Sequence, residues 1–407
     1  MRHQARWRAP LQLRGGPSGA EFLASVVASQ GFRNIAPRRS LHPGAGVESL
    51  QFKTGDFRMA GALFDVLPLP GATFGGVVKF KGGMGARAAI ETLARAPEAL
   101  PDAIYKAGGF FLIPGMDEII DEPQLLVRLS RLFGPEVENN LTTYSAENKT
   151  IFNVHPNVPE IIIVTNAPPI NSQPMARPEP PLTADGKLPT RFPHRRGWHT
   201  DQSFRRPPPD FSLFIAVEPT PQGQGQTLFA DAAGAYDALP ADLKRRIENV
   251  EGLHALPSNG RSEKAVRSGV APKPLLPHQR SQKHKLVRVH PVTGRTSIYM
   301  CEAGQMDWVD GPIVGMTPGP DGDGAKLVYE LMSHITQDRF VYAHEWTRGE
   351  MVIWDNRNML HAPTWYDSDK YIRIMWRTTV MGNPGPEYAG ERPSWIPVSE
   401  GTEGARA

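Results

Sequence analysis

The sequence contains very little cysteine and no long apolar run. Its single cysteine, Cys301, allows neither an intramolecular disulfide nor a metal site built from several cysteines. No stretch approaches the roughly 18 consecutive apolar residues of a membrane-spanning helix, so we expect no membrane partner. The formal net charge is only +3 over 407 residues, which argues against a nucleic-acid partner. These absences favour a cytoplasmic protein that acts on a small molecule.

Proline and glycine, by contrast, are abundant, at 40 and 39 residues. Frequent chain breakers favour short strands and loops, so we expect a mainly β fold with flanking α-helices, such as a sandwich or jelly roll. No glycine-rich phosphate loop follows a predicted strand, which leaves a nucleotide-binding α/β fold without support. Hydrophobic periodicity predicts helices over 89–107, 122–133, 232–250 (interrupted at Pro240) and 325–337. It predicts strands over 110–113, 160–165, 211–217, 226–230, 285–290, 296–300, 339–345, 350–355 and 371–380, with edge strands within 64–80.

The two ends differ in composition from the middle. Residues 1–46 are rich in arginine and nearly free of acid, which predicts a disordered extension and leaves an organelle transit peptide as the alternative. We expect one domain over 47–385 and a flexible tail over 386–407. Within the domain, the proline-rich stretch 167–197 is predicted to be a lid-like loop. Assembly into a homo-oligomer is left open.

One short segment carries a candidate metal site. On a strand, residues two apart point to the same face, so His199 and Asp201 would present an imidazole and a carboxylate to one ion. His361, which follows an apolar strand, is the candidate third ligand. Two histidines and one carboxylate are typical of non-haem iron(II) oxygenases. Alone, a His-x-Asp pair arises by chance about once in every one or two such chains, so structural histidines remain the alternative.

A second segment predicts an anion site. Arg373 and Arg377 would face the same side of an extended strand. Arginines that point into a β core are costly unless they meet anions, and a guanidinium suits a carboxylate. Thr227 could add a hydroxyl donor to the same carboxylate. The alternative is two surface arginines on a half-exposed strand.

Taken together, these motifs resemble the TauD/TfdA family of taurine and 2,4-dichlorophenoxyacetate dioxygenases over residues 67–383. The resemblance implies a distorted double-stranded β-helix, a jelly roll, that uses Fe(II), 2-oxoglutarate and O2. It also implies roles by position: His199, Asp201 and His361 for iron, Thr227 and Arg373 for the far carboxylate of 2-oxoglutarate, and Arg377 for an anionic group of the substrate. Two departures exist, since Trp376 stands where the family has histidine, and Gly225-Gln226 replaces Gly-Asp.

The resemblance further implies hydroxylation of a small anionic substrate (a sulfonate, carboxylate or sulfate ester), with release of succinate and CO2. Candidate pocket residues are Asn153, His155 and Arg195, each with a structural role as the alternative. The basic segments 191–206 and 261–288 could steer an anion, or could be a solvated surface. Two other functions stay open, a zinc or manganese hydrolase with the same triad and a non-catalytic binding or sensor protein.

Overall fold

The computed structural model describes residues 59–143, 153–168, 182–302 and 304–396. The predicted extension 1–46, the domain boundary at 47 and residues 397–407 lie outside these ranges. So does much of the predicted lid, of which the described parts, 167–168 and 182–197, contain neither helix nor strand. No helix within the described ranges is long and apolar enough to cross a bilayer.

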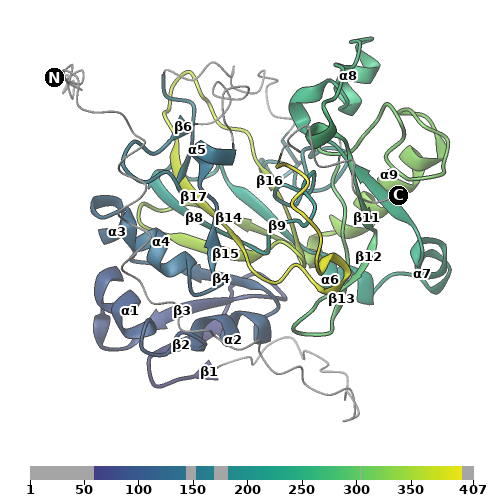
Figure 1. Ribbon diagram of the computed structural model, residues 1–407. Helices are drawn as coiled ribbons and strands as arrows, with labels where there is room; N and C mark the ends of the chain where they lie inside the picture. Colours follow the sequence, from purple (N-terminus) through teal and green to yellow (C-terminus); the bar gives the residue numbers. More distant parts are fainter. Residues whose placement is uncertain (1–58, 144–152, 169–181, 303, 397–407) are drawn as a thin grey trace, which may run out of the picture. The chain divides into compact units, whose positions relative to one another are not determined.

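Most of the described strands belong to one large sheet (Figure 1). The sheet has ten strands, and every pairing in it is antiparallel except that between β3 and β4. Its order is β1 (Met59–Ala60), β2 (Phe64–Pro68), β3 (Gly76–Phe80), β4 (Phe110–Ile113), β15 (Met351–Asp355), β8 (Phe211–Glu218), β17 (Ile374–Met381), β7 (Ile162–Thr165) and β6 (Asn153–Val154), with β5 (Glu136–Val137) paired to β17.

A second, three-stranded sheet carries part of the candidate site. Its order is β14 (Val341–His344), β9 (Thr227–Asp231) and β16 (Met359–Pro363). Two strand pairs stand apart, β10 (Glu251–His254) with β11 (Gln282–Lys285), and β12 (Val287–Val289) with β13 (Thr296–Ile298). The helices are α1 (Ala86–Leu93), α2 (Ala99–Lys106), α3 (Glu118–Asp121), α4 (Gln124–Ser130), α5 (Asn140–Thr143), α6 (Ala232–Asp237), α7 (Ala241–Ile247), α8 (Glu263–Arg267) and α9 (Asp323–Ile335).

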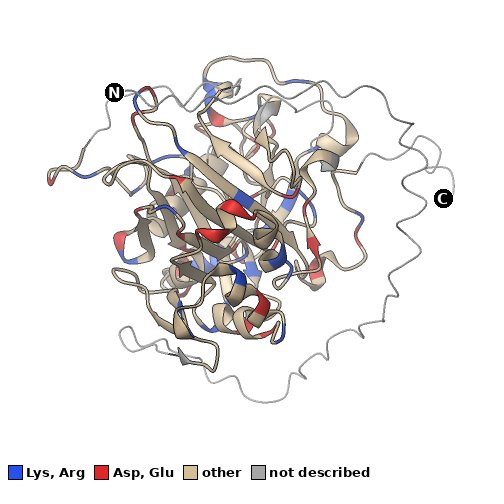
Figure 2. Cartoon of the chain, turned by 90° about the vertical axis from the view of Figure 1, so that its left-hand side faces the viewer, with Lys and Arg blue, Asp and Glu red and all other residues tan. Residues whose placement is uncertain are grey.

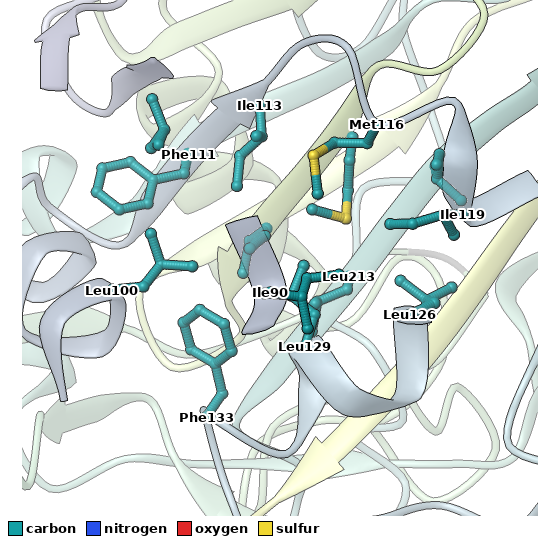
Figure 3. Packing of buried hydrophobic residues seen from close by; sticks show 14 of the residues in the cluster. Ile90, Leu100, Phe111, Ile113, Met116, Ile119, Leu126, Leu129, Phe133 and Leu213 are labelled. Atoms are coloured by element: carbon teal, nitrogen blue, oxygen red, sulfur yellow. The ribbon is translucent and has the colours of Figure 1, made fainter. Parts of the chain in front are cut away.

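Alternation along the strands separates the apolar residues into layers. In β8, Leu213 and Ile215 face the core beneath helices α1 to α4, while Phe214 faces the other side of the sheet. Figure 3 shows Leu213 among side chains from those helices, such as Ile90 and Leu129. The opposite side of the large sheet packs against the three-stranded sheet, whose own outer side is covered by α6, α7 and α9. The candidate site therefore lies between two sheets that are each supported from outside.

Most predicted elements are present, with one difference among the helices. The region 89–107 forms two helices, α1 and α2, because Pro97 lacks an amide proton and disfavours helix at the residue before it. Of the predicted flexible tail, residues 386–396 are described, and some of their side chains contact the rest of the chain. Tyr388 is buried there against His284, and the Trp395 ring lies under the Arg205 guanidinium.

Buried histidines make stability depend on pH. Burial lowers the pKa of His254 to about 3, with a further contribution from Arg288, and that of His344 to about 4. A histidine in the unfolded chain titrates at about pH 6.5. Below that pH the unfolded chain therefore binds more protons than the folded chain, so the folded state has its full stability only above about pH 6.5. We expect the unfolding free energy to fall by about 1.4 kcal/mol per pH unit for each histidine as the pH drops from 6.5 toward 4.

Urea denaturation of wild type and His254→Leu at several pH values measures this slope. In His254→Leu the slope of the unfolding free energy against pH should be smaller by the contribution of one histidine. Equal stability of the wild type at pH 7 and pH 5 would contradict the expectation.

Candidate metal centre

A backbone bridge brings the two histidines together. The His199 amide donates to the His361 carbonyl at 2.9 Å, and the His361 amide donates to the His199 carbonyl at 2.7 Å. Such a mutual antiparallel pair places both side chains on one face, and the two ring centroids are 4.1 Å apart. His361 follows the apolar strand β15, as expected from the sequence, and lies in the middle of the next strand, β16.

Asp201 reaches the same point from a turn. The prediction that His199 and Asp201 share a strand was wrong. The chain enters a turn at Asp201, and Gln202, which follows Asp201, has a positive φ of 50°. Asp201 Oδ1 nevertheless lies 3.9 Å from His199 Nε2 and 3.8 Å from His361 Nε2. One ligand atom from each of the three residues lies within 4.8 Å of the others. This is the donor set expected for a divalent transition metal.

Neighbouring groups orient these donors. His199 Nδ1 donates to the Gly197 carbonyl at 2.9 Å, which leaves the Nε2 lone pair facing the other two ligands. Ser212 Oγ donates to Asp201 Oδ2 at 2.6 Å, and Asn356 Nδ2 donates to Ser212 Oγ at 3.1 Å. The local sequence gave no signal for Ser212, which is one alternating residue of a strand. Asn356 could have been suspected from its place in Trp354-Asp355-Asn356-Arg357.

Burial and charge set protonation states that suit a metal. Burial lowers the pKa of His199, and it lowers that of His361 to about 3 with help from the neighbouring His199. Burial alone would raise the pKa of Asp201, but Arg377 and the two histidines hold it at about 2. At neutral pH the site therefore offers two neutral imidazoles and a carboxylate, the forms that bind metal.

Arg377 contacts the Asp201 carboxylate directly. Its Nη1 donates to Asp201 Oδ1 at 2.6 Å, the oxygen nearest both histidines. The sequence had suggested a substrate anion as its partner, whereas the structure shows the Asp201 carboxylate in that place. Its Nε is buried and has no partner among the described residues, so the guanidinium keeps a free donor.

Arg373 is a buried arginine without an anion. It lies just before β17, next to a register shift at Ile374 and Met375, with its guanidinium carbon 5.8 Å from the centre of the Phe214 ring. Burial lowers its pKa to about 10, an effect that Tyr366 partly opposes. Among the described residues no carboxylate pairs with it, and its Nε is buried without a partner. An unpaired buried cation is costly, which fits a site that receives an anionic ligand.

Thr227 begins β9 and faces the space between the sheets. Its Oγ1 accepts a hydrogen bond of 3.0 Å from Trp346 Nε1. The Trp346 ring packs edge-on against Phe214, with centroids 5.4 Å apart, and Phe214 in turn contacts Arg373. Phe214 and Trp346 thus connect the two residues predicted to hold a carboxylate, and neither was identified from the sequence.

Two of the three candidate pocket residues lie on the other side of the large sheet. Asn153 pairs with Ile163, which also pairs with Trp376, so by register it faces the side of the sheet opposite Arg377. The His155 ring packs against Trp376 at 4.9 Å on that same side. The structure therefore does not join Asn153 and His155 to the metal triad.

Arg195 differs, because its Nε is buried without a partner in the described structure. Burial lowers its pKa to about 10, although Glu302 opposes the shift. Arg195 is thus a half-buried arginine whose Nε has free hydrogen-bonding capacity, on the segment that leads into His199.

Several arginines of the basic segments pair with carboxylates. Most of these partners are distant in sequence, Glu263 beside Arg267 being the exception, and Figure 2 shows basic and acidic residues interspersed. The pairs are Arg196 with Glu263 and Glu302, Arg205 with Glu138, Arg206 with Glu391, Arg261 with Asp307, Arg267 with Glu263, and Arg288 with Glu387. Steering of an anion by these arginines is therefore not supported.

Removing the Ser212 hydroxyl should weaken metal binding. Ser212→Ala frees Asp201 Oδ2 to rotate, and loss of a partner that orients a ligand typically costs about 10- to 100-fold in metal affinity. Ser130→Ala is the matched control, because Ser130 is equally buried but bonds Thr378 next to α4. Calorimetric titration with a divalent metal compares the two, and equal losses would contradict an orienting role.

Comparison with known proteins gives one family match. The model of the family described as "Taurine catabolism dioxygenase TauD, TfdA family" matches residues 79–379. (S)-phenoxypropionate/alpha-ketoglutarate-dioxygenase of Sphingobium herbicidovorans is 34% identical over 47% of this chain and 64% of its own length. The alpha-ketoglutarate-dependent 2,4-dichlorophenoxyacetate dioxygenase of Cupriavidus pinatubonensis is 36% identical over 45% of this chain and 59% of its own. The chain thus spans about three fifths of the length of these two relatives.

Two solved structures extend the comparison over most of the fold. AAD-2 in complex with Mn(II) and N-oxalylglycine is 26% identical, with a TM-score of 0.53, over 79% of this chain and 97% of that one. A taurine dioxygenase from Burkholderia xenovorans is 22% identical, with a TM-score of 0.50, over 80% of this chain and 94% of that one. The latter shows similarity of fold alone.

Proposed function

The chain belongs to the taurine catabolism dioxygenase TauD, TfdA family, and on that premise we propose that it is an Fe(II)- and 2-oxoglutarate-dependent dioxygenase. In the proposed reaction, 2-oxoglutarate, O2 and a substrate C–H bond give succinate, CO2 and a hydroxylated product. One oxygen atom of O2 enters succinate and the other enters the product. The proposed architecture is the double-stranded β-helix of the family, over a single domain.

The observation that carries the proposal is the buried, unpaired guanidinium of Arg373 in the same fold as the His2Asp triad. A metal site alone is compatible with many activities, but a buried cation without a partner favours the binding of an anionic cosubstrate. N-oxalylglycine, which AAD-2 binds together with Mn(II), carries the same pair of carboxylates as 2-oxoglutarate.

Each residue then has a task. His199, Asp201 and His361 would hold Fe(II), which supplies the redox chemistry that activates O2. Arg373 and Thr227 would bind the far carboxylate of 2-oxoglutarate and so orient its oxo-acid end toward the metal. Arg377 neutralises the charge of Asp201 and has a free Nε for an anionic group.

For the substrate we propose a small organic anion, a carboxylate, a sulfonate or a sulfate ester. Two relatives are named for phenoxy carboxylates and another for sulfonates. Arg195 is a candidate for its anionic group, because its buried Nε lacks a partner in the described structure. A cytoplasmic location and assembly into a homo-oligomer remain predictions from the sequence.

The test is succinate formation from 2-oxoglutarate in air, with Fe(II), across a panel of aryloxy acids and alkyl sulfonates. We expect succinate to form at a rate that depends on the panel compound, and Arg195→Met to weaken the preferred compound more than 2-oxoglutarate. Turnover of an ester or amide with Zn(II) or Mn(II), without 2-oxoglutarate, would instead show a hydrolase. Binding without any turnover would indicate a sensor.

A further inference from the structure

The indole of Trp346 donates to the Thr227 hydroxyl in a fully enclosed place. The distance from Nε1 to Oγ1 is 3.0 Å, and both residues are 4% exposed. Trp346 lies in the turn between β14 and β15, so it comes from a different part of the chain than β9. Bulk solvent therefore has little access to this hydrogen bond.

This hydrogen bond limits which further hydrogen bond the Thr227 hydroxyl can make. A threonine hydroxyl has one proton to donate and two lone pairs to accept with. An indole N–H can only donate, so it must occupy a lone pair of Oγ1 and leaves the Thr227 proton free. In the part of the chain that the structure describes, no acceptor is recorded for that proton. A carboxylate, which in its ionised form can only accept, is the complementary partner.

The indole is also held in place. Its ring is edge-on to His344, with centroids 4.4 Å apart, and to Phe214 at 5.4 Å. Gln222 Nε2 donates to the Trp346 carbonyl at 3.3 Å. Since Phe214 also lies against the Arg373 guanidinium, the indole is fixed relative to both proposed carboxylate-binding residues.

We propose that Trp346 is a positioning residue for the cosubstrate: it fixes the Thr227 hydroxyl so that its proton points to the far carboxylate of 2-oxoglutarate. This inference rests on the proposed function, because it assigns that carboxylate to Thr227. It concerns the affinity for 2-oxoglutarate and not that for the metal, whose ligands Trp346 does not touch. Without the indole N–H, nothing recorded in the described structure would fix the direction of the hydroxyl.

A double-mutant cycle tests the inference. Trp346→Phe keeps an aromatic ring but deletes the N–H together with part of the indole, so the cycle is needed to separate the hydrogen bond from packing; Thr227→Val deletes the hydroxyl. We expect Thr227→Val to weaken 2-oxoglutarate binding to the Fe(II)-loaded protein by about 10- to 100-fold, the scale of a hydrogen bond to a charged group. Trp346→Phe should cost about 5- to 10-fold in the wild-type background. In the Thr227→Val background it should cost no more than about 2-fold, because the group it acts through is gone.

Three results would contradict either the role of Trp346 or the proposed function. An equal loss from Trp346→Phe in both backgrounds overturns the inference and shows that the indole acts only through packing. A matching loss of Fe(II) affinity in Trp346→Phe also overturns it. If the wild type does not bind 2-oxoglutarate at all, the proposed function itself fails, which is a different result from a wild type that binds with an additive cycle.

A second measurement serves if Trp346→Phe does not fold. In the metal-free protein, Thr227→Val should shift the ¹⁵N-indole resonance of Trp346, since it removes the hydrogen-bond acceptor. An unchanged indole resonance overturns the inference.

Discussion

Replacing Asp201 with alanine is expected to abolish Fe(II) binding and succinate formation. Asp201 is the single negative charge among the three ligands, and the variant leaves Arg377, which now bonds Asp201 Oδ1 at 2.6 Å, as an uncompensated cation beside the metal position. At an effective dielectric of 20, one unit charge at 4 Å contributes about 4 kcal/mol, or about 10³-fold in affinity. The loss should be at least that large.

A second substitution separates the two contributions. In Asp201→Ala combined with Arg377→Met, the repulsive guanidinium is gone, so part of the metal affinity should return while activity stays absent. Calorimetric titration with Fe(II) under argon measures both variants. Wild-type affinity in Asp201→Ala would show that the metal binds elsewhere.

Replacing Arg373 with methionine should separate cosubstrate binding from stability. Methionine fills a similar volume without charge, so 2-oxoglutarate should bind about 10²-fold more weakly or worse, the scale for truncating one partner of a buried charge pair, while Fe(II) affinity is retained. The ligand-free protein should not be destabilised, because the lost guanidinium is buried without a carboxylate partner among the described residues. Thermal melts with and without 2-oxoglutarate report both effects.

Arg205→Met is the matched control for that variant. Arg205 is also buried, but its Nη1 pairs with Glu138 Oε1 at 2.6 Å. Removing it leaves Glu138 as an uncompensated buried charge, which typically costs about 3–5 kcal/mol. A ligand-free Arg373→Met that is destabilised as much as Arg205→Met would mean that Arg373 serves the fold and not a cosubstrate.

The sequence predicted the three metal-binding candidates, but with the wrong geometry. Residues two apart on a strand would have placed His199 beside Asp201, whereas the chain turns there and Gln202 takes a positive φ. The contact that aligns the imidazoles is the backbone bridge to His361, some 160 residues away. Local periodicity does not contain information on such a pairing.

The sequence also gave no information on which charged residues form ion pairs. The basic segments suggested a steering surface, yet Arg196 and Arg205 meet Glu302 and Glu138, which lie far along the chain. Alternation along the strand predicted that Arg373 is a buried cation, and it predicted that Arg377 faces the same side of that strand. Neither pattern could show that Arg377 bonds Asp201, because that contact depends on how the turn after His199 folds back.

Anaerobic titration of the purified protein with Fe(II) and then 2-oxoglutarate tests the metal-plus-dicarboxylate site most directly. Chelation of Fe(II) by the oxo acid produces a visible charge-transfer band. We predict that the band appears only when both are present, saturates at one 2-oxoglutarate per chain, and is lost in Asp201→Ala. Absence of the band in the wild type, together with no succinate formed in air, would contradict the account.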